Sequence, residues 1–290
     1  MLPSSILALR ELLSHRLPDE FSRIVLDGSM RVAWDAANPI RANLFAAGIR
    51  ELITYILHHL APDELVKACG WYISHRAREM NLAEKNNKEF KDQPTRMHRM
   101  MYATQGGLPD DALEGMGVDI KDDHKRLRSV VDELSKYTHV RPGSLVEGDA
   151  EVNAFMDEAL RAVIRFLDTF REGRDAIEEA VAERINDAAD AALTETSIDE
   201  LDELSTHTYV EEVVADDVRV TAIGPDEVQF SVRGTVYVEL NYGSSSDFNR
   251  GDGATMSGKY PFSVRMAASI HDMKPYILGR IAVDNSSFYE

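Results

Sequence analysis

The stretch Val228–Tyr242, VQFSVRGTVYVELNY, decides the fold class of this chain. Its apolar side chains recur at every second position, at Val228, Phe230, Val232, Val236, Val238, Leu240 and Tyr242. A period of two places alternate side chains on one face, as in a β-strand with one buried side. Gly234 falls on the apolar phase, and we expect a bulge or a sharp bend there.

Shorter stretches on both sides of this strand predict further strands. Val218 and Val220 indicate a preceding strand, which Gly224-Pro225-Asp226 turns back, and a following strand is expected around Val264. Ile281 and Val283 favour one more. The sequence therefore predicts a small antiparallel β-rich C-terminal domain over residues 205–290.

Upstream, the apolar period changes to that of an α-helix. The clearest helix begins near Asp149 and carries Val152, Phe155, Met156, Ala159, Leu160, Val163, Phe166, Leu167 and Phe170. We expect Gly173 to interrupt it, and residues 186–206 to form an exposed connecting helix or linker.

Further helices are predicted over 3–16, around 95–104 and over 121–138, and one that starts at Asn38-Pro39. The fold class is accordingly α+β. An N-terminal all-α helical bundle over residues 1–204 precedes the β-rich domain.

Composition and charge limit the kind of protein. Hydrophobic residues make up 44% and charged residues 28% of the 290 residues, which is typical of a folded soluble domain. No run approaches the roughly 18 apolar residues of a membrane span, and the N-terminus indicates an amphipathic helix rather than a signal peptide. The single cysteine, Cys69, excludes an internal disulfide and a cysteine-based zinc site. We expect a cytoplasmic protein without membrane contact.

The charge is unevenly distributed along the chain. The net charge is −18, yet residues 41–141 hold 16 Lys and Arg against 15 Asp and Glu, a balance of +1, so the remainder carries −19. The same region holds six of the nine histidines. An anionic substrate would therefore bind in this region. The alternative is that the acidic remainder serves only solubility.

Common enzyme motifs are missing. The sequence contains no Walker A lysine loop, no GxGxxG after a strand, no GxSxG and no HExxH. The polar loop 244–253 places oxygen-bearing side chains at alternate positions, but an ordinary connection between two strands explains it better than a calcium site. We expect no cofactor and no bound metal.

A set of arginine and histidine residues in the balanced region suggests chemistry on phosphate. Histidine exchanges protons near neutral pH, and arginine binds phosphate or stabilises a developing phosphorane. The predicted catalytic residues are His139, Arg50 and Glu51. The predicted nucleic-acid contacts are Arg41, Arg96, Arg99, Tyr102 and Arg141.

Two expectations concern the surroundings of this set. Arg50 needs a partner because its neighbours Ile49 and Leu52 are apolar, and Glu51 is not expected to supply one, since adjacent helical residues point in different directions. The alternative interpretation is structural. Arginines tie helices together, and the helix dipole favours a histidine at a helix C-terminus.

Several segments of the chain resemble one known family. Asn38-Pro39-Ile40-Arg41, Arg50-Glu51-Leu52, Ala61-Pro62-Asp63 and Cys69-Gly70-Trp71 resemble the helical part of the predicted pPIWI-associating nucleases of bacterial defence loci. Gly234 to Asp247, Gly251-Asp252-Gly253 and Tyr260-Pro261-Phe262 look like a β-module that occurs at the C-termini of bacterial conflict-system proteins.

The helical half also looks like HEPN domains, which are dimeric helical bundles and often RNases. HEPN RNases usually carry Arg, four to six residues, then His. Ten residues separate Arg128 from His139, whereas Arg10 to His15 and Arg265 to His271 match the spacing at other places in the chain. The resemblance implies a HEPN-like helical domain that forms a homodimer.

Three functional hypotheses follow. The first is a metal-independent, RNase-like effector of a prokaryotic defence or conflict system, with RNA or another nucleic acid as its partner. The second is a non-catalytic dimeric interaction or sensor protein whose β domain binds a protein partner. The third is a metal-dependent nuclease, although no spacing gathers the carboxylates at one site.

Overall fold

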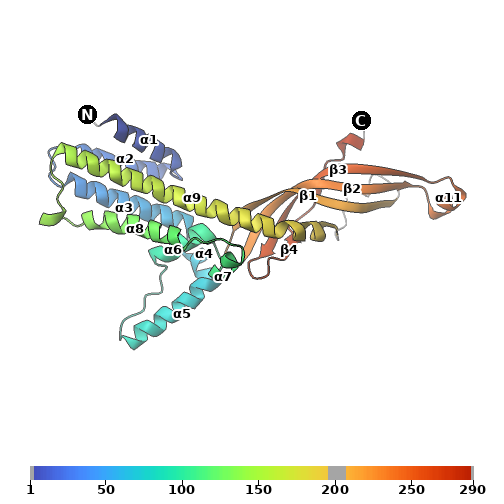
Figure 1. The fold of residues 1–290 in the computed structure, drawn as a ribbon, viewed down its shortest axis with the longest axis horizontal. Coiled ribbons are helices and arrows are strands. Elements are labelled where there is room, and N and C mark those ends of the chain that lie inside the picture. Colours follow the sequence, from blue (N-terminus) through green and yellow to red (C-terminus); the bar gives the residue numbers. More distant parts are fainter. Residues whose placement is uncertain (1–2, 195–206, 289–290) are drawn as a thin grey trace. The chain divides into compact units, whose positions relative to one another are not determined.

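The computed structural model describes residues 3–194 and 207–288. The chain forms two compact units, a helical unit of residues 1–106 and 119–176 and a sheet unit of residues 107–118 and 177–290. Helices precede a C-terminal antiparallel sheet, which confirms the predicted α+β fold class (Figure 1). The predicted domain boundary at 204/205 lies outside the described residues.

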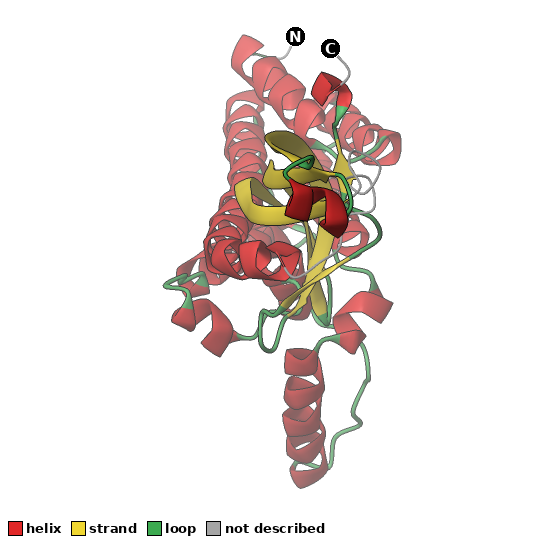
Figure 2. Ribbon diagram, turned by 90° about the vertical axis from the view of Figure 1, so that its right-hand side faces the viewer, coloured by secondary structure: helices red, strands yellow, loops and turns green. Residues whose placement is uncertain are grey.

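The helical unit is built from amphipathic helices. They are α1 (Ser4–Arg16), α2 (Glu20–Trp34), α3 (Arg41–Leu60), α4 (Asp63–Ala68), α5 (Gly70–Lys85), α6 (Arg96–Gln105), α8 (Lys121–Tyr137) and the first part of α9 (Asp149–Thr194). A 3-10 turn, η1 (Pro142–Ser144), lies between α8 and α9. α5 projects from the bundle, and the segment after it returns to α6 (Figures 1 and 2).

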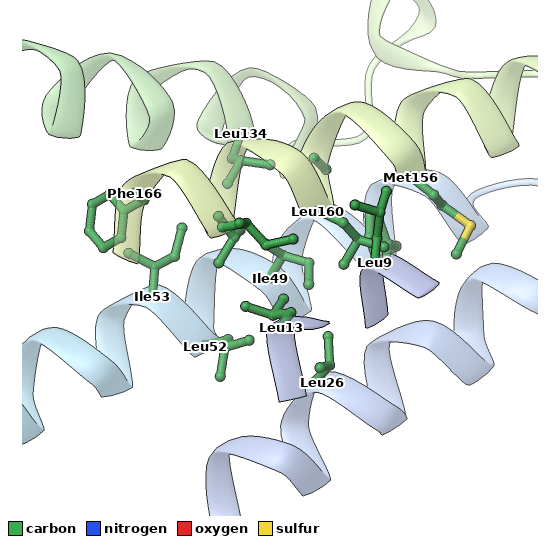
Figure 3. Packing of buried hydrophobic residues seen from close by; sticks show 14 of the residues in the cluster. Leu9, Leu13, Leu26, Ile49, Leu52, Ile53, Leu134, Met156, Leu160 and Phe166 are labelled. Carbon is green, nitrogen blue, oxygen red and sulfur yellow. The ribbon is translucent and has the colours of Figure 1, made fainter. Parts of the chain in front are cut away.

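The apolar faces of these helices meet in one core. α1, α2, α3, α8 and α9 all contribute to it, with Leu13, Leu26, Ile49, Leu134 and Leu160 among the residues in close contact (Figure 3). Ile49 and Leu160 are fully buried. Burying a side chain of this size contributes about 1.5–3 kcal/mol, so this core holds the helices that frame the candidate site.

Three details of the helices differ from the sequence prediction. α9 continues through Gly173, so the expected interruption is wrong. A Cβ at Gly173 would meet the Cγ2 of Thr104 at 3.8 Å, so this glycine faces α6 instead of ending a helix.

The start signal at Asn38-Pro39 is also displaced, because α3 begins at Arg41 and the Asn38 side chain accepts a hydrogen bond from the Ile40 amide at 3.1 Å. α2 was not predicted, although Asp19 and Ser22 form a capping box at its start.

The sheet unit holds five strands among the described residues, all paired in antiparallel fashion. They are β1 (His207–Ile223), β2 (Glu227–Tyr242), β3 (Ala254–Ser269), β4 (Pro275–Ile277) and β5 (Ala282–Val283), and the order is β1-β2-β3-β4 with β5 also on β3. Short helical elements, α7 (Asp110–Gly115), α11 (Ser245–Arg250) and η2 (Ser286–Phe288), complete the unit with the second part of α9. The predicted strand over 228–242 is confirmed, and its alternate side chains are buried.

Gly234 lies where the backbone of β1 leaves no room for a side chain on β2. A Cβ at this position would lie 2.0 Å from the carbonyl oxygen of Val214. The register of β1 shifts between Ala215 and Asp217, opposite Gly234 and Arg233, so the expected irregularity lies in the neighbouring strand. The loop after β2 contains α11, in which Asp247 binds Ser244 and Arg250.

The described residues lack two features. No helix in this part of the chain is long and apolar enough to cross a membrane. No group of three or more His, Cys, Asp or Glu side chains within it is arranged to hold a metal ion.

Candidate functional site

The candidate site begins with two polar residues on one side of α3. Asn43 and Arg50 are seven residues apart, so they lie on the same side of the helix, about 10 Å apart along its axis. The Asn43 amide donates hydrogen bonds of 2.9 Å to the carbonyl oxygens of both Tyr137 and Ser144. Asn43 is only 1% exposed. One buried side chain therefore fixes both ends of residues 138–144, which we call the 138–144 turn.

The 138–144 turn is also fixed from within. The Ser144 hydroxyl donates to the His139 carbonyl oxygen at 2.6 Å and accepts from the Arg141 amide at 3.0 Å. His139 and Arg141 are nevertheless exposed. The backbone is held in place while the imidazole and the guanidinium of these residues face solvent.

Arg50 connects α3 to this turn. Its Nη1 donates to the Thr138 hydroxyl at 3.2 Å, and its Nη2 donates to the Glu51 carboxylate at 2.9 Å. The expectation that Glu51 would not pair with Arg50 is therefore wrong, because both side chains are long enough to meet beyond the helix surface. Exposed ion pairs of this kind contribute about 0–1 kcal/mol, so the contact orients Arg50 more than it stabilises the fold.

The structure thus brings the three predicted catalytic residues into one neighbourhood. Arg50 and Glu51 are adjacent on α3, and Arg50 contacts the residue that immediately precedes His139. A guanidinium stabilises negative charge on phosphate oxygens, and an accessible imidazole transfers protons near neutral pH. The arrangement is suited to acid–base chemistry on a phosphodiester, because a nucleic-acid strand in solution can reach the exposed side chains.

Two of the predicted nucleic-acid contacts, Arg99 and Tyr102, are buried in α6. Arg99 donates to the Ala61 carbonyl at 2.6 Å and to the Asp63 carboxylate at 2.5 Å. This hydrogen bond lowers the pKa of Asp63. Tyr102 is 7% exposed, and burial raises its pKa. Both side chains hold α6 against the segment that carries α4.

Arg41 is also engaged within the helical unit. It is 9% exposed and pairs with Asp149 at the start of α9. The ion pair lines a cavity of about 470 Å³ with Trp34 and Asn153. Arg41 and Arg99 therefore tie helices together, as the structural interpretation of the arginines describes.

Arg96 and Arg141 are the exposed members of the predicted binding set. Arg96 lines a hollow of about 320 Å³ together with Arg128, whose guanidinium lies 3.5 Å from Asp132. Arg141 lies in the 138–144 turn, two residues after His139. These two side chains are accessible to a ligand in solution.

His98 belongs to a small aromatic cluster. Its ring lies 5.0 Å from that of Tyr72 and 6.1 Å from that of Trp71, and its Nδ1 accepts a hydrogen bond from the Thr95 amide at 3.2 Å. Burial lowers the pKa of His98. His98 therefore has a structural role, because its ring takes part in the cap at the start of α6.

The two stretches with HEPN-like Arg–His spacing lie elsewhere. Arg10 on α1 donates to Asp27 on α2 at 2.7 Å, and His15 lies 3.2 Å from Glu11. Arg265 lies on β3, and His271 is exposed in the turn that follows that strand.

Sequence reasoning missed Asn43, Thr138 and Ser144. A signal for Asn43 does exist, since it precedes Arg50 by two helical turns and interrupts an otherwise apolar run. Thr138 and Ser144 have no such signal, because polar residues near Pro142-Gly143 are ordinary in a turn.

The fold and the site define a helical protein with a C-terminal sheet and an exposed Arg/His site at one end of α8. Two family models, both described as predicted pPIWI-associating nuclease, match the chain over residues 13–163 and 170–289. The first match alone spans more than half of the chain and contains the whole candidate site. The chain belongs to the predicted pPIWI-associating nuclease family, as its sequence motifs indicated. Comparisons with curated proteins and with solved structures gave no significant match.

Proposed function

We propose that this protein is a metal-independent, RNase-like nuclease that acts in a prokaryotic defence or conflict system. Family membership supports nuclease activity. The observation that carries the finer proposal is the Arg50–Thr138 hydrogen bond, which joins a guanidinium to the residue before an exposed histidine. The defence context rests on the family name and on the resemblance of the β-module to conflict-system proteins.

The residues suggest how cleavage proceeds. In RNA the 2′-hydroxyl is already positioned to attack the adjacent phosphorus, so no metal-activated water is required. The new bond joins the 2′-oxygen to phosphorus, and the bond from phosphorus to the 5′-oxygen breaks. His139 takes the proton of the 2′-hydroxyl, and the departing 5′-oxygen receives a proton from water or from an imidazolium. Arg50, oriented by Glu51, stabilises the charge that develops on the phosphorane.

A cleavage assay tests this proposal. Labelled single-stranded RNA and DNA of the same sequence are incubated with the wild type, His139→Ala and Arg50→Ala in the presence of a chelator. His58→Ala is the matched control, because His58 is an exposed histidine in the last turn of α3, outside the site and outside the stretches with HEPN-like spacing. We expect RNA cleavage with a 2′,3′-cyclic phosphate product, a loss of about 100-fold or more in both site variants, and full activity in the control. Equal cleavage by all variants would exclude a catalytic role for His139 and Arg50. Loss of cleavage on addition of the chelator would exclude a metal-independent reaction.

The homodimer is part of the proposal. A two-fold arrangement of helical units would place two Arg/His sites on one particle. Light scattering coupled to size exclusion measures the mass directly. A mass of one chain, 32.5 kDa, at assay concentration would contradict the dimer.

A second candidate is a non-catalytic interaction or sensor protein. β2 buries every second side chain and leaves Gln229, Arg233 and Tyr237 exposed on the other face of the sheet. Such a face can serve as a docking surface for a protein partner. Co-expression with the products of neighbouring genes, followed by co-purification of the wild type and of Tyr237→Ala, distinguishes this role. Cleavage that depends on His139 would favour the nuclease.

A further inference from the structure

Three arginines from separate segments of the sheet unit line one hollow. Arg233 comes from β2, Arg265 from β3 and Arg280 from the connection between β4 and β5. The hollow has a volume of about 370 Å³, and Ser231 and Ser263 also line it. We propose that this hollow binds the phosphate groups of a single-stranded nucleic acid. We call it the arginine hollow.

The strand register places the first two arginines on the same face of the sheet. Ser231 is opposite Arg265, and Arg233 is opposite Ser263. Cross-strand partners point to the same side, and alternate residues of one strand do too, so Arg233 and Arg265 are diagonal neighbours on one face, about 7–8 Å apart. A phosphate group is small enough to lie between two guanidiniums at this spacing.

Arg280 is brought to the same place by the connection that follows β4. β4 pairs with β3 at Met266, and β5 pairs with β3 at Ser263, so residues 278–281 run alongside β3 next to Arg265. The Leu278 amide donates to the Arg265 carbonyl at 2.8 Å. Gly279 adopts a φ of +96°, a backbone conformation that glycine adopts without strain. The connection is therefore fixed at both ends and presents Arg280 to the hollow.

The charges in the hollow lack internal compensation. Within residues 3–194 and 207–288, none of these three guanidiniums lies within 4.0 Å of a carboxylate. The nearby Asp217, which is opposite Arg233 in the register, lies 2.8 Å from Arg219 instead. Three like charges with no carboxylate in contact raise the local potential, and this occurs in a chain with a net charge of −18. A bound anion is the natural complement.

The chemistry of the lining identifies the anion. Guanidiniums bind phosphate oxygens through paired N–H groups, and the serine hydroxyls supply further donors. The arginines are exposed, so the site is open and can accommodate a phosphate group in the middle of a nucleic-acid chain. A nucleic acid is the phosphate-bearing ligand that fits the nuclease family. The choice of a nucleic-acid strand as the ligand therefore rests on the proposed function.

Fluorescence anisotropy with a labelled 12-nucleotide single-stranded RNA tests the proposal. The full chain carries His139→Ala throughout, so that the probe stays intact. Arg265→Gln combined with Arg280→Gln is expected to weaken binding at least tenfold and to lower the salt dependence of log K by about 0.7 for each lost phosphate contact. Arg161→Gln is the matched control, because this exposed arginine of α9 is already paired with Asp157 and lies outside the sheet that forms the hollow. Unchanged affinity and salt dependence in the double variant would overturn the proposal.

Two further arms test the role of charge and the size of the ligand. Arg265→Lys with Arg280→Lys keeps the charge but removes the paired N–H donors, so its affinity is expected to lie between those of the wild type and the Gln double variant. An affinity no higher than that of the Gln double variant, in a folded protein with an unchanged melting temperature, would contradict a site built on charge. An unlabelled 5′-mononucleotide or inorganic phosphate is also added as a competitor of the labelled RNA. If either displaces the RNA at a concentration as low as that of the unlabelled oligomer, the hollow binds a small phosphate ligand, and the proposal that it binds a nucleic-acid strand is overturned. Binding that persists in a chain that cleaves neither RNA nor DNA would support the hollow while the nuclease proposal fails.

Discussion

The Nη1 of Arg50 donates a hydrogen bond of 3.2 Å to the hydroxyl of Thr138, a residue 88 positions later in the chain. The hydroxyl also donates to the Ser135 carbonyl at 2.9 Å, so its position is set by the last turn of α8. Thr138 therefore positions Arg50 from a rigid helix end. It is a positioning residue in the proposed site and contacts no substrate itself.

Thr138→Val is expected to lower the rate of RNA cleavage about tenfold, which corresponds to about 1.4 kcal/mol of transition-state stabilisation. Valine keeps the shape of threonine but has no acceptor for Arg50, so the guanidinium moves more freely. Thr138→Ser restores the acceptor and is expected to restore activity. Single-turnover cleavage rates of the two variants provide the comparison. Equal rates for Val and Ser would show that the hydrogen bond has no positioning role.

Asn43→Leu is expected to lower the free energy of unfolding by about 1–3 kcal/mol. The substitution removes the donor to Tyr137 and Ser144 and leaves two carbonyl groups without their partner in a buried environment. Urea denaturation measures the change. Asn153→Leu is the matched control, since Asn153 is half-buried on α9 and makes no side-chain hydrogen bond to the described residues. A similar loss of stability in both variants would argue against a specific contribution of the two Asn43 hydrogen bonds.

Local periodicity predicted the elements of the fold better than their contacts. The alternation at 228–242 depends only on which side chains are apolar, so β2 could be read from the sequence directly. Gly173 was misread because its role depends on Thr104, a residue of another helix. A glycine that faces close packing and a glycine that ends a helix look alike in one dimension.

The candidate site shows the same limit. The types of residue needed for phosphate chemistry were recognisable, and Arg50 and His139 were selected on that ground. Whether an arginine is free or structural depends on distant carboxylates, as Arg41 with Asp149 and Arg99 with Asp63 illustrate. Partners of this kind are separated by 36 residues or more, and no local pattern encodes them.

Gly234→Ala is expected to destabilise the protein, whereas Gly28→Ala is expected to stabilise it. A Cβ at Gly234 would lie 2.0 Å from the Val214 carbonyl oxygen, so β1 would have to move and lose ladder hydrogen bonds. We expect a loss of about 1–3 kcal/mol. A Cβ at Gly28 meets nothing within 4 Å, and alanine in a helix is favoured by about 0.5–1 kcal/mol. Thermal melts of both variants check the signs, and a stable Gly234→Ala protein would contradict the close approach.

His98→Asn is expected to flatten the acid dependence of stability. Burial holds the pKa of His98 below its ordinary value, so the unfolded chain binds the proton more readily than the folded protein. Stability from this group is complete above about pH 6.5 and decreases as the pH falls through that value toward the folded pKa. Asparagine removes the titrating ring and still offers an acceptor to the Thr95 amide. Urea midpoints measured between pH 7.5 and 5 should therefore fall less in this variant than in the wild type. A slope in His98→Asn equal to that of the wild type would contradict this contribution of His98.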